Sequence, residues 1–246
     1  MGLHICYDLR LPADTPVAHV VTVLERLRAQ ATGPGVHITA LFRFSLAHLQ
    51  RKRAPGWTGL DRYFDVIAGI VLRTRDGIVQ YNPADRDRVA ALGFALHPGR
   101  GSEAATFGFV RPLVAAPGDG AENDDPGAHA AWYWTACCKT QYASIVSTAH
   151  LIRCHQLIVV LLDSLRAMGV GVTVRDETGY WETRSVDTLV REVTRMNRIV
   201  ARLGGALADA MPDGVRPAGA IFEHPEFERL EMEGRRQDDE SQGDPD

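Results

Sequence analysis

An eleven-residue alternation of side chains, from Trp132 to Tyr142, limits the fold more strongly than any other part of the sequence. Its tryptophans occupy one set of alternate positions, and its polar side chains occupy the other. Successive side chains of a β-strand point to opposite faces of a sheet, so this period predicts a strand with one apolar and one polar face. The polar set is Tyr133, Thr135, Cys137, Lys139 and Gln141.

The elements that follow this strand predict a compact α+β unit. Ser147 is positioned to cap a helix that ends before Gly169, and Ser185 is positioned to cap a long amphipathic helix. Strands are predicted at 170–176, 180–183 and 218–223, the first two joined as a hairpin. The order β-α-β-β-α-β is the ferredoxin-like arrangement.

The first half follows a similar order if its additional segments are insertions. Leu3–Leu11 alternates and predicts a strand, and a helix begins at Pro16 and ends near Gly33. Further strands, helices and a hairpin are predicted at 36–42, 45–53, 65–81, 82–93, 94–97 and 105–111. Residues 20–29 match residues 158–167 in pattern, and this similarity suggests an internal duplication.

We therefore predict an α+β protein of two ferredoxin-like (βαββαβ) units with antiparallel sheets. The first unit spans 1–114 and contains insertions, and the second spans 131–233. A flexible linker rich in glycine, proline and aspartate is predicted between them at 115–130. Residues 234–246 are charged and poor in apolar side chains, which predicts a disordered acidic tail.

Charge and hydropathy exclude two classes of protein. The formal net charge is −4, and residues 223–246 hold ten acids against three arginines, so the rest of the chain is nearly neutral. Nucleic-acid binders usually carry a strongly basic face, so that class is excluded. No apolar run approaches the roughly 18 residues of a membrane span. The N-terminus lacks the pattern of a signal peptide, which favours a cytoplasmic protein.

The cysteines show no zinc-binding pattern. Cys6, Cys137, Cys138 and Cys154 lack CxxC spacing, and the adjacent pair at 137 and 138 points to opposite sides of a strand. His150 and Cys154 share a helix face at the spacing of ligand pairs, but no third ligand follows from the pattern. We predict free thiols, no metal and no cofactor.

Two polar strand faces are the candidate binding surface. His4, Cys6, Asp8 and Arg10 share a side of the first strand, and the polar set of 132–142 would face them if the two units paired open face to open face. Such a cleft is a typical ligand site, although a solvated sheet face gives the same pattern. The predicted ligand-binding residues are Asp8, Arg10, Tyr133, Gln141 and Arg175. Their mixture of charges favours an anionic ligand.

Three residues are candidates for catalysis. Only two of the 27 basic residues are lysines, Lys52 and Lys139, a bias typical of a GC-rich bacterial genome. A lysine desolvated among aromatic side chains can act as a base, a nucleophile or an anion anchor. His155 falls on the apolar side of its helix and is expected to be buried. Glu182 is placed to face Asp176 across the predicted hairpin as an acid–base pair.

Two functional hypotheses remain open. The first is a small-molecule binding protein, or an enzyme of unspecified reaction, with its site in the cleft between the two sheet faces. The second is an interaction protein, such as an accessory or immunity-type protein, that contacts its partner through the linker and the acidic tail. Pairing of two copies of the chain is compatible with either hypothesis.

Overall fold

The computed structural model describes residues 2–45, 72–74, 77–79, 89–112, 131–212 and 217–242. Its strands are β1 (Ile5–Leu11), β2 (His37–Ile38), β3 (Phe42–Ser45), β4 (Leu72–Thr74), β5 (Gly77–Val79), β6 (Val89–His97), β7 (Ala105–Pro112), β8 (Trp132–Cys138) and β9 (Gly171–Asp176). Its helices are α1 (Val17–Gln30), α4 (Thr148–Ala167), α5 (Tyr180–Thr183), α6 (Val186–Asp209) and α7 (Phe227–Gln242), with short 3-10 helices η2 (Gln141–Ile145) and η3 (Ala220–Glu223).

Seven of these strands form one antiparallel sheet. Its order is β2-β6-β7-β8-β1-β9, and β3 pairs with a part of β6 that β2 leaves free. The first strand of the chain, β1, lies between β8 and β9, both from the second half. Because α4 connects β8 to β9 across β1, these elements form a split βαβ unit.

The protein is therefore an α+β protein with an antiparallel sheet, as the sequence predicts. The two ferredoxin-like units are not confirmed, because strands from both halves belong to the same sheet. The linker predicted at 115–130 and the helix predicted at 45–53 lie outside the described residues, except for Ser45 at the end of β3. β4 and β5 form a separate hairpin where the sequence predicts one.

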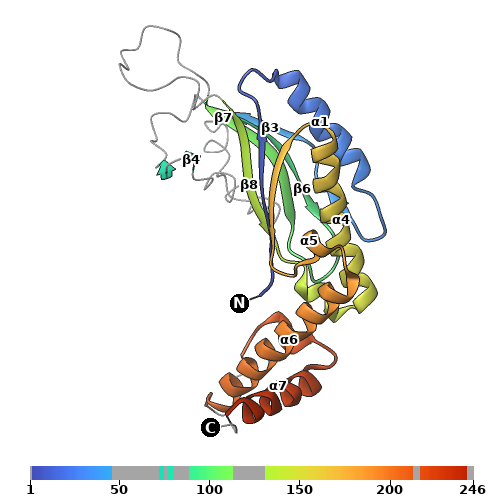
Figure 1. The fold of residues 1–246 in the computed structure, drawn as a ribbon, viewed down its shortest axis with the longest axis vertical. Helices are drawn as coiled ribbons and strands as arrows, with labels where there is room; N and C mark the ends of the chain where they lie inside the picture. Colours follow the sequence, from blue (N-terminus) through green and yellow to red (C-terminus); the bar gives the residue numbers. More distant parts are fainter. Residues whose placement is uncertain are drawn as a thin grey trace.

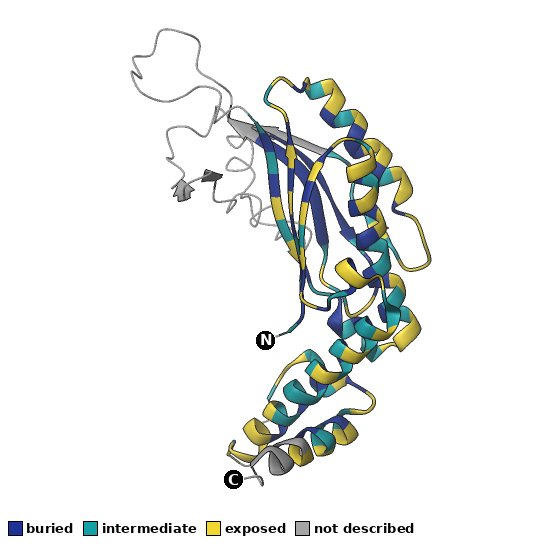
Figure 2. Ribbon diagram, viewed as in Figure 1, coloured by how far each residue is buried: buried dark blue, intermediate teal, exposed yellow. Residues whose placement is uncertain are grey.

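Helices α1 and α4 cover one face of the sheet, and the main core lies between them and the strands (Figures 1 and 2). Alternation works as predicted in β1, where Tyr7 and Leu9 are buried and Asp8 and Arg10 are exposed. The largest fully buried side chains include Trp132, Trp134, Tyr7, Phe94, Phe107 and Phe109.

The polar atoms of these buried aromatic side chains are satisfied. The Thr106 carbonyl accepts hydrogen bonds from the Tyr7 hydroxyl (2.8 Å) and the Trp134 indole (2.9 Å). The Trp132 indole donates to the Thr15 carbonyl at 2.9 Å. A buried tyrosine or tryptophan usually needs such a partner, so these bonds help to fix the orientation of the rings in the core.

Helices α6 and α7 pack together as an arm that extends beyond the sheet (Figure 1). Ala201 and Leu230 are buried between them, together with Ile221 of η3. The two helices approach closely at Gly234, where an added Cβ would lie 2.7 Å from the Arg198 carbonyl oxygen. None of the described helices combines the length and apolar character that a bilayer-spanning segment requires.

Several segments differ from the predicted elements. Tyr180–Thr183 forms α5 instead of a strand, and 220–223 forms η3 instead of a strand. The helix predicted at 82–93 is contradicted from Val89 onward, because β6 begins there and pairs with β3 and β7. Its earlier residues are not described. Helix α7 continues through Gly234 to Gln242, into the segment expected to be a disordered tail.

Candidate ligand-binding site

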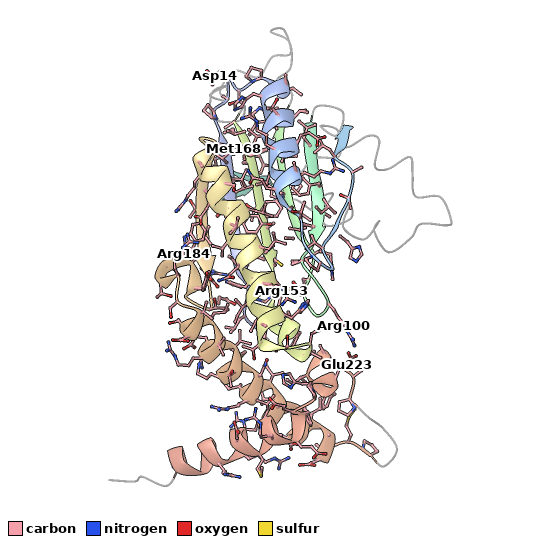
Figure 3. The ribbon with its side chains drawn as sticks, turned by 90° about the vertical axis from the view of Figure 1, so that its right-hand side faces the viewer. Asp14, Arg100, Arg153, Met168, Arg184 and Glu223 are labelled. Atoms are coloured by element: carbon pink, nitrogen blue, oxygen red, sulfur yellow. A yellow bond between two sulfur atoms is a disulfide. The ribbon has the colours of Figure 1, made fainter. Side chains whose placement is uncertain are left out.

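A pocket with a cavity volume of about 250 Å³ lies where the sheet meets the helical arm. One wall is the loop between β6 and β7, a second is the segment that follows β8, and the third is η3. Figure 3 shows Arg100 of the loop and Glu223 of η3 close together beside the first turn of α4. The lining residues are Arg100, Gly101, Ser102, Glu103, Lys139, Tyr142, Ile145, Ala220 and Glu223.

The loop wall is held close to the end of β8 by backbone contacts. Glu103 N–H donates to the Lys139 carbonyl (2.8 Å), and Lys139 N–H donates to the Glu103 carboxylate (3.2 Å). Gly101 has φ +82°, and a Cβ there would lie only 2.2 Å from the Tyr142 carbonyl oxygen. Only glycine combines this conformation with so close an approach. The glycine turn therefore fixes the loop against the opposite wall.

Lys139 directly follows β8 and lines the pocket. Its side chain is half-buried, and its ammonium lies 5.5 Å from the centroid of the Tyr142 ring. Gly2 packs beside it, since a Cβ on Gly2 would lie 2.6 Å from Lys139 Cε. Within the described part of the chain, no carboxylate lies within 4.0 Å of the ammonium. Its positive charge is therefore available to a ligand.

Tyr142 is the aromatic wall of the pocket. Burial, and to a lesser extent the charge of Glu103, raise the pKa of its phenol. The phenol therefore stays protonated at neutral pH, as an O–H donor. Tyr142 also packs against the small apolar cluster of the helical arm, which connects this wall to α6 and α7.

Behind Lys139, three buried side chains form a hydrogen-bonded chain. Thr140 Oγ1 lies 2.9 Å from His155 Nδ1, and His155 Nε2 lies 3.0 Å from Asp176 Oδ2. Because a carboxylate can only accept, Nε2 of His155 is the donor to Asp176. His155 is fully buried, as its position on the helix predicts.

Asp176 ends this hydrogen-bonded chain and also contacts the first turn of α5. Its carboxylate accepts from the backbone N–H groups of Thr178 and Trp181, each at 2.9 Å, and from the Thr178 hydroxyl at 2.7 Å. Burial alone raises the pKa of Asp176, but the His155 interaction and the Thr178 hydrogen bonds outweigh it and lower the pKa overall. Asp176 is therefore a buried carboxylate, paired with His155.

Gln141 anchors the same segment to two other elements. Its amide oxygen accepts from Leu3 N–H (2.8 Å), and its amide nitrogen donates to Asn197 Oδ1 of α6 (2.8 Å). Asn197 in turn donates to the Ser144 hydroxyl at 3.0 Å. Residues 139–142 are thus fixed by contacts to the N-terminus, α4, α6 and the β6–β7 loop.

Asp176, His155 and Thr140 follow the order carboxylate–imidazole–hydroxyl of a catalytic triad with a hydroxyl nucleophile. The burial of the Thr140 hydroxyl argues against catalysis by this triad. Thr140 is 2% exposed and does not line the pocket. A nucleophile must reach its substrate, and Thr140 does not in this structure. The chain of hydrogen bonds holds the backbone that follows Lys139.

The other predicted ligand residues lie on the open face of the sheet. Asp8 is paired in register with Thr135 and Thr173, and Arg10 is paired with Tyr133, so these side chains share one face. They lie side by side in a single sheet and do not face each other across a cleft, which corrects the prediction. Arg175 is exposed on the same face, and its Nη2 lies 3.9 Å from Glu177 Oε1. Asp8, Arg10 and Arg175 do not line the pocket.

Tyr133 lies on the predicted face of the sheet, opposite Arg10, whereas Gln141 and Glu182 depart from their expected positions. The Tyr133 hydroxyl is buried and has no hydrogen-bond partner among the described residues, and burial raises the pKa of this phenol. Gln141 is buried in η2 and not on a strand face. Glu182 is exposed on α5, and the acid–base pair with Asp176 is not formed, because Asp176 binds His155 and contacts the first turn of that helix.

The cysteines correct the prediction of four free thiols. Cys6 and Cys137, directly opposite each other on β1 and β8, form a disulfide, whereas Cys138 and Cys154 are free and buried. His150 Nε2 lies 3.5 Å from Cys154 Sγ, and burial is the main cause that raises the pKa of that thiol. Among the described residues, no group of three or more His, Cys, Asp or Glu side chains could hold a metal ion.

Of the pocket residues, only Lys139 was a sequence candidate. Arg100, Glu103 and Glu223 come from segments that strand alternation does not connect to Lys139. Tyr142 ends the predicted strand but lies in η2 in the structure. The one signal for the loop was its glycine spacing, Gly99-Arg100-Gly101-Ser102, which marks a tight turn but not what the turn packs against. No protein-family model, curated protein or solved structure matches this chain.

Proposed function

We propose that this protein binds a small anionic molecule in the pocket at the end of β8, with Lys139 and Arg100 holding its carboxylate or phosphate group. The observation that carries this proposal is the Lys139 ammonium, which lines the pocket and has no ion-pair partner among the described residues. Ammonium and guanidinium groups form strong, charge-assisted hydrogen bonds with such anions.

The buried network supports the proposal. A buried polar network is stabilising only when its members are satisfied, and here it fixes Thr140 and Gln141, the two residues that follow Lys139. Binding sites gain affinity when the supporting side chains are held in place before the ligand arrives. In this proposal Thr140, His155 and Asp176 are positioning residues, and the cation at Lys139 contacts the ligand.

The test is a titration of wild type and Lys139→Gln with a panel of small carboxylates and phosphates, by calorimetry and thermal shift. Loss of a charged hydrogen bond of about 1.5–3 kcal/mol should weaken binding by about 10- to 100-fold. Arg10→Gln is the matched control, since it removes one positive charge from the exposed face of the sheet. Binding that is lost in Arg10→Gln but kept in Lys139→Gln would place the site on the sheet face and contradict the proposal.

A second candidate, a protein-interaction function, is favoured by apolar side chains on the helical arm. Leu203 and Leu207 lie four residues apart on α6 and are 41% and 54% exposed. Met232 of α7 is also exposed. Side chains four apart share a helix face, so the two leucines form one apolar strip. We propose a second copy of the chain as its partner.

Sedimentation of wild type and the double variant Leu203→Glu/Leu207→Glu tests this second candidate. The wild type should be a dimer and the double variant a monomer, because paired carboxylates would be buried at the interface. Val160→Glu, at an exposed apolar position on α4, is the control. A monomeric wild type at all concentrations up to about 100 µM, well above typical dimer dissociation constants, would exclude it.

A further inference from the structure

The pocket contains charges of both signs in equal number. Arg100 and Glu103 come from the β6–β7 loop, Lys139 from the end of β8 and Glu223 from η3. No ion pair within 4.0 Å joins any two of them in the described structure. Elsewhere opposite charges that lie near each other do pair, as in Arg198–Glu233 (2.6 Å) and Arg184–Asp163 (2.9 Å).

Local contacts explain why two of these pocket charges stay apart. The Glu103 carboxylate already accepts from Lys139 N–H at 3.2 Å, on the backbone side of that residue. The Lys139 ammonium instead lies over the Tyr142 ring. The backbone N–H of Lys139 therefore binds the Glu103 carboxylate, whereas the Lys139 ammonium lies elsewhere, over the Tyr142 ring. The pocket offers an anion-binding group and a cation-binding group at different places.

Electrostatics then select the ligand class. A ligand with one negative charge would be attracted by Lys139 and Arg100 but repelled by Glu103 and Glu223, and a ligand with one positive charge would meet the reverse. A molecule that carries both charges can meet each group with its opposite. Ser102 supplies a further polar group on the lining.

We infer that the pocket binds a small aminocarboxylate, with the carboxylate at Lys139 and Arg100 and the ammonium at Glu103 and Glu223. This inference rests on the proposed function and narrows its ligand class. The cavity volume of about 250 Å³ suits a molecule of this size. It is smaller than the roughly 300–1,000 Å³ that is usual for drug-sized ligands.

The test uses three matched series of probes: straight-chain amino acids of two to six carbons with a terminal ammonium, the acids without the ammonium, and the amines without the carboxylate. Calorimetry on the full chain should show at least one amino acid binding about tenfold or more tightly than its matched acid and amine. Glu223→Gln should weaken amino-acid binding by a similar factor without weakening binding of the acid. Lys139→Gln should weaken both.

Glu182→Gln is the control, because it removes another exposed carboxylate, one that does not line the pocket. Circular dichroism of each variant will show whether it is folded. If the acids bind as tightly as the amino acids and Glu223→Gln strengthens their binding, the aminocarboxylate inference fails and the anion-binding proposal stands. If only amines bind, or if no member of the three series binds at millimolar concentration, the inference is overturned. If amines bind and no acid or amino acid does, the anion proposal is overturned as well.

Discussion

The pair formed by His155 and Asp176 shows how much a few buried atoms control in this protein. Asp176 receives hydrogen bonds from an imidazole, a hydroxyl and two backbone N–H groups. A buried carboxylate without such partners is strongly destabilising. The Asp176 carboxylate also accepts from the Trp181 N–H in α5, and through His155 it holds Thr140 in place. The local fold and the segment beside the pocket therefore both depend on this carboxylate.

The lowered pKa of Asp176 predicts a specific dependence of stability on pH. A carboxyl group whose pKa is lower in the folded state contributes stability above its ordinary value of 3.8, and that contribution is lost as the pH falls through the folded value. Urea unfolding should therefore show Asp176→Asn less stable than wild type at about pH 6, with the difference shrinking at about pH 2.5. Asp14→Asn, which alters an exposed carboxylate on the loop before α1, should show no such trend. An Asp176→Asn deficit of equal size at both pH values would contradict the assignment.

Individual helices illustrate which elements the sequence can predict. α4 and α6 have long apolar stripes and begin at Ser147 and Ser185, whose hydroxyls accept from the backbone N–H three residues later, as predicted. The four residues of α5 give too short a pattern to predict a helix. Its N-cap residue is Gly179, and its Trp181 N–H donates to the Asp176 carboxylate at the end of the preceding strand. Short elements depend on contacts that periodicity does not contain.

At the α6–α7 crossing, helix propensity and packing predict opposite effects of Gly234→Ala on stability. Alanine is favoured over glycine inside a helix by about 1 kcal/mol, so Gly234→Ala would stabilise an isolated α7. Here the new Cβ would lie 2.7 Å from the Arg198 carbonyl oxygen and 3.0 Å from Arg202 Cβ. We expect the free energy of unfolding to fall by about 1–3 kcal/mol, the usual effect of overpacking. Chemical denaturation measures it, and a stabilised variant would mean that the helices cross less closely.

For the molecule as a whole, the pairing of strands was the part that the sequence could not predict. Alternation correctly placed Asp8, Arg10 and Thr135 on one face, but it does not show which strands become neighbours. The insertion of β1 between β8 and β9 brought the two polar sets side by side. With both polar sets in one sheet, no cleft forms between two sheets, and the candidate site is instead the pocket at the end of β8. Lys139 can be singled out from the sequence because it directly follows the alternating residues of β8, whereas Arg100, Glu103 and Glu223 come from segments that are distant in the sequence.

The same pairing places Cys6 opposite Cys137, so the disulfide closes a loop between residues 131 positions apart in the sequence. A cross-link over so long a loop removes conformational freedom from the unfolded chain, and such bonds typically contribute about 2–4 kcal/mol. We expect dithiothreitol to lower the midpoint of thermal unfolding by several degrees. The double variant Cys6→Ser/Cys137→Ser should unfold at the lower temperature with or without reductant.

Thiol counting separates this effect from a general effect of reductant. In denaturant without reductant, alkylation should modify only Cys138 and Cys154, and after reduction it should modify all four cysteines. If all four react before reduction, the bond is absent in the isolated protein and the β1–β8 pairing is held by backbone hydrogen bonds and the aromatic core alone. If two react and reduction still leaves the midpoint unchanged, the unfolded chain must already be compact. The cross-link would then restrict little further freedom in that state.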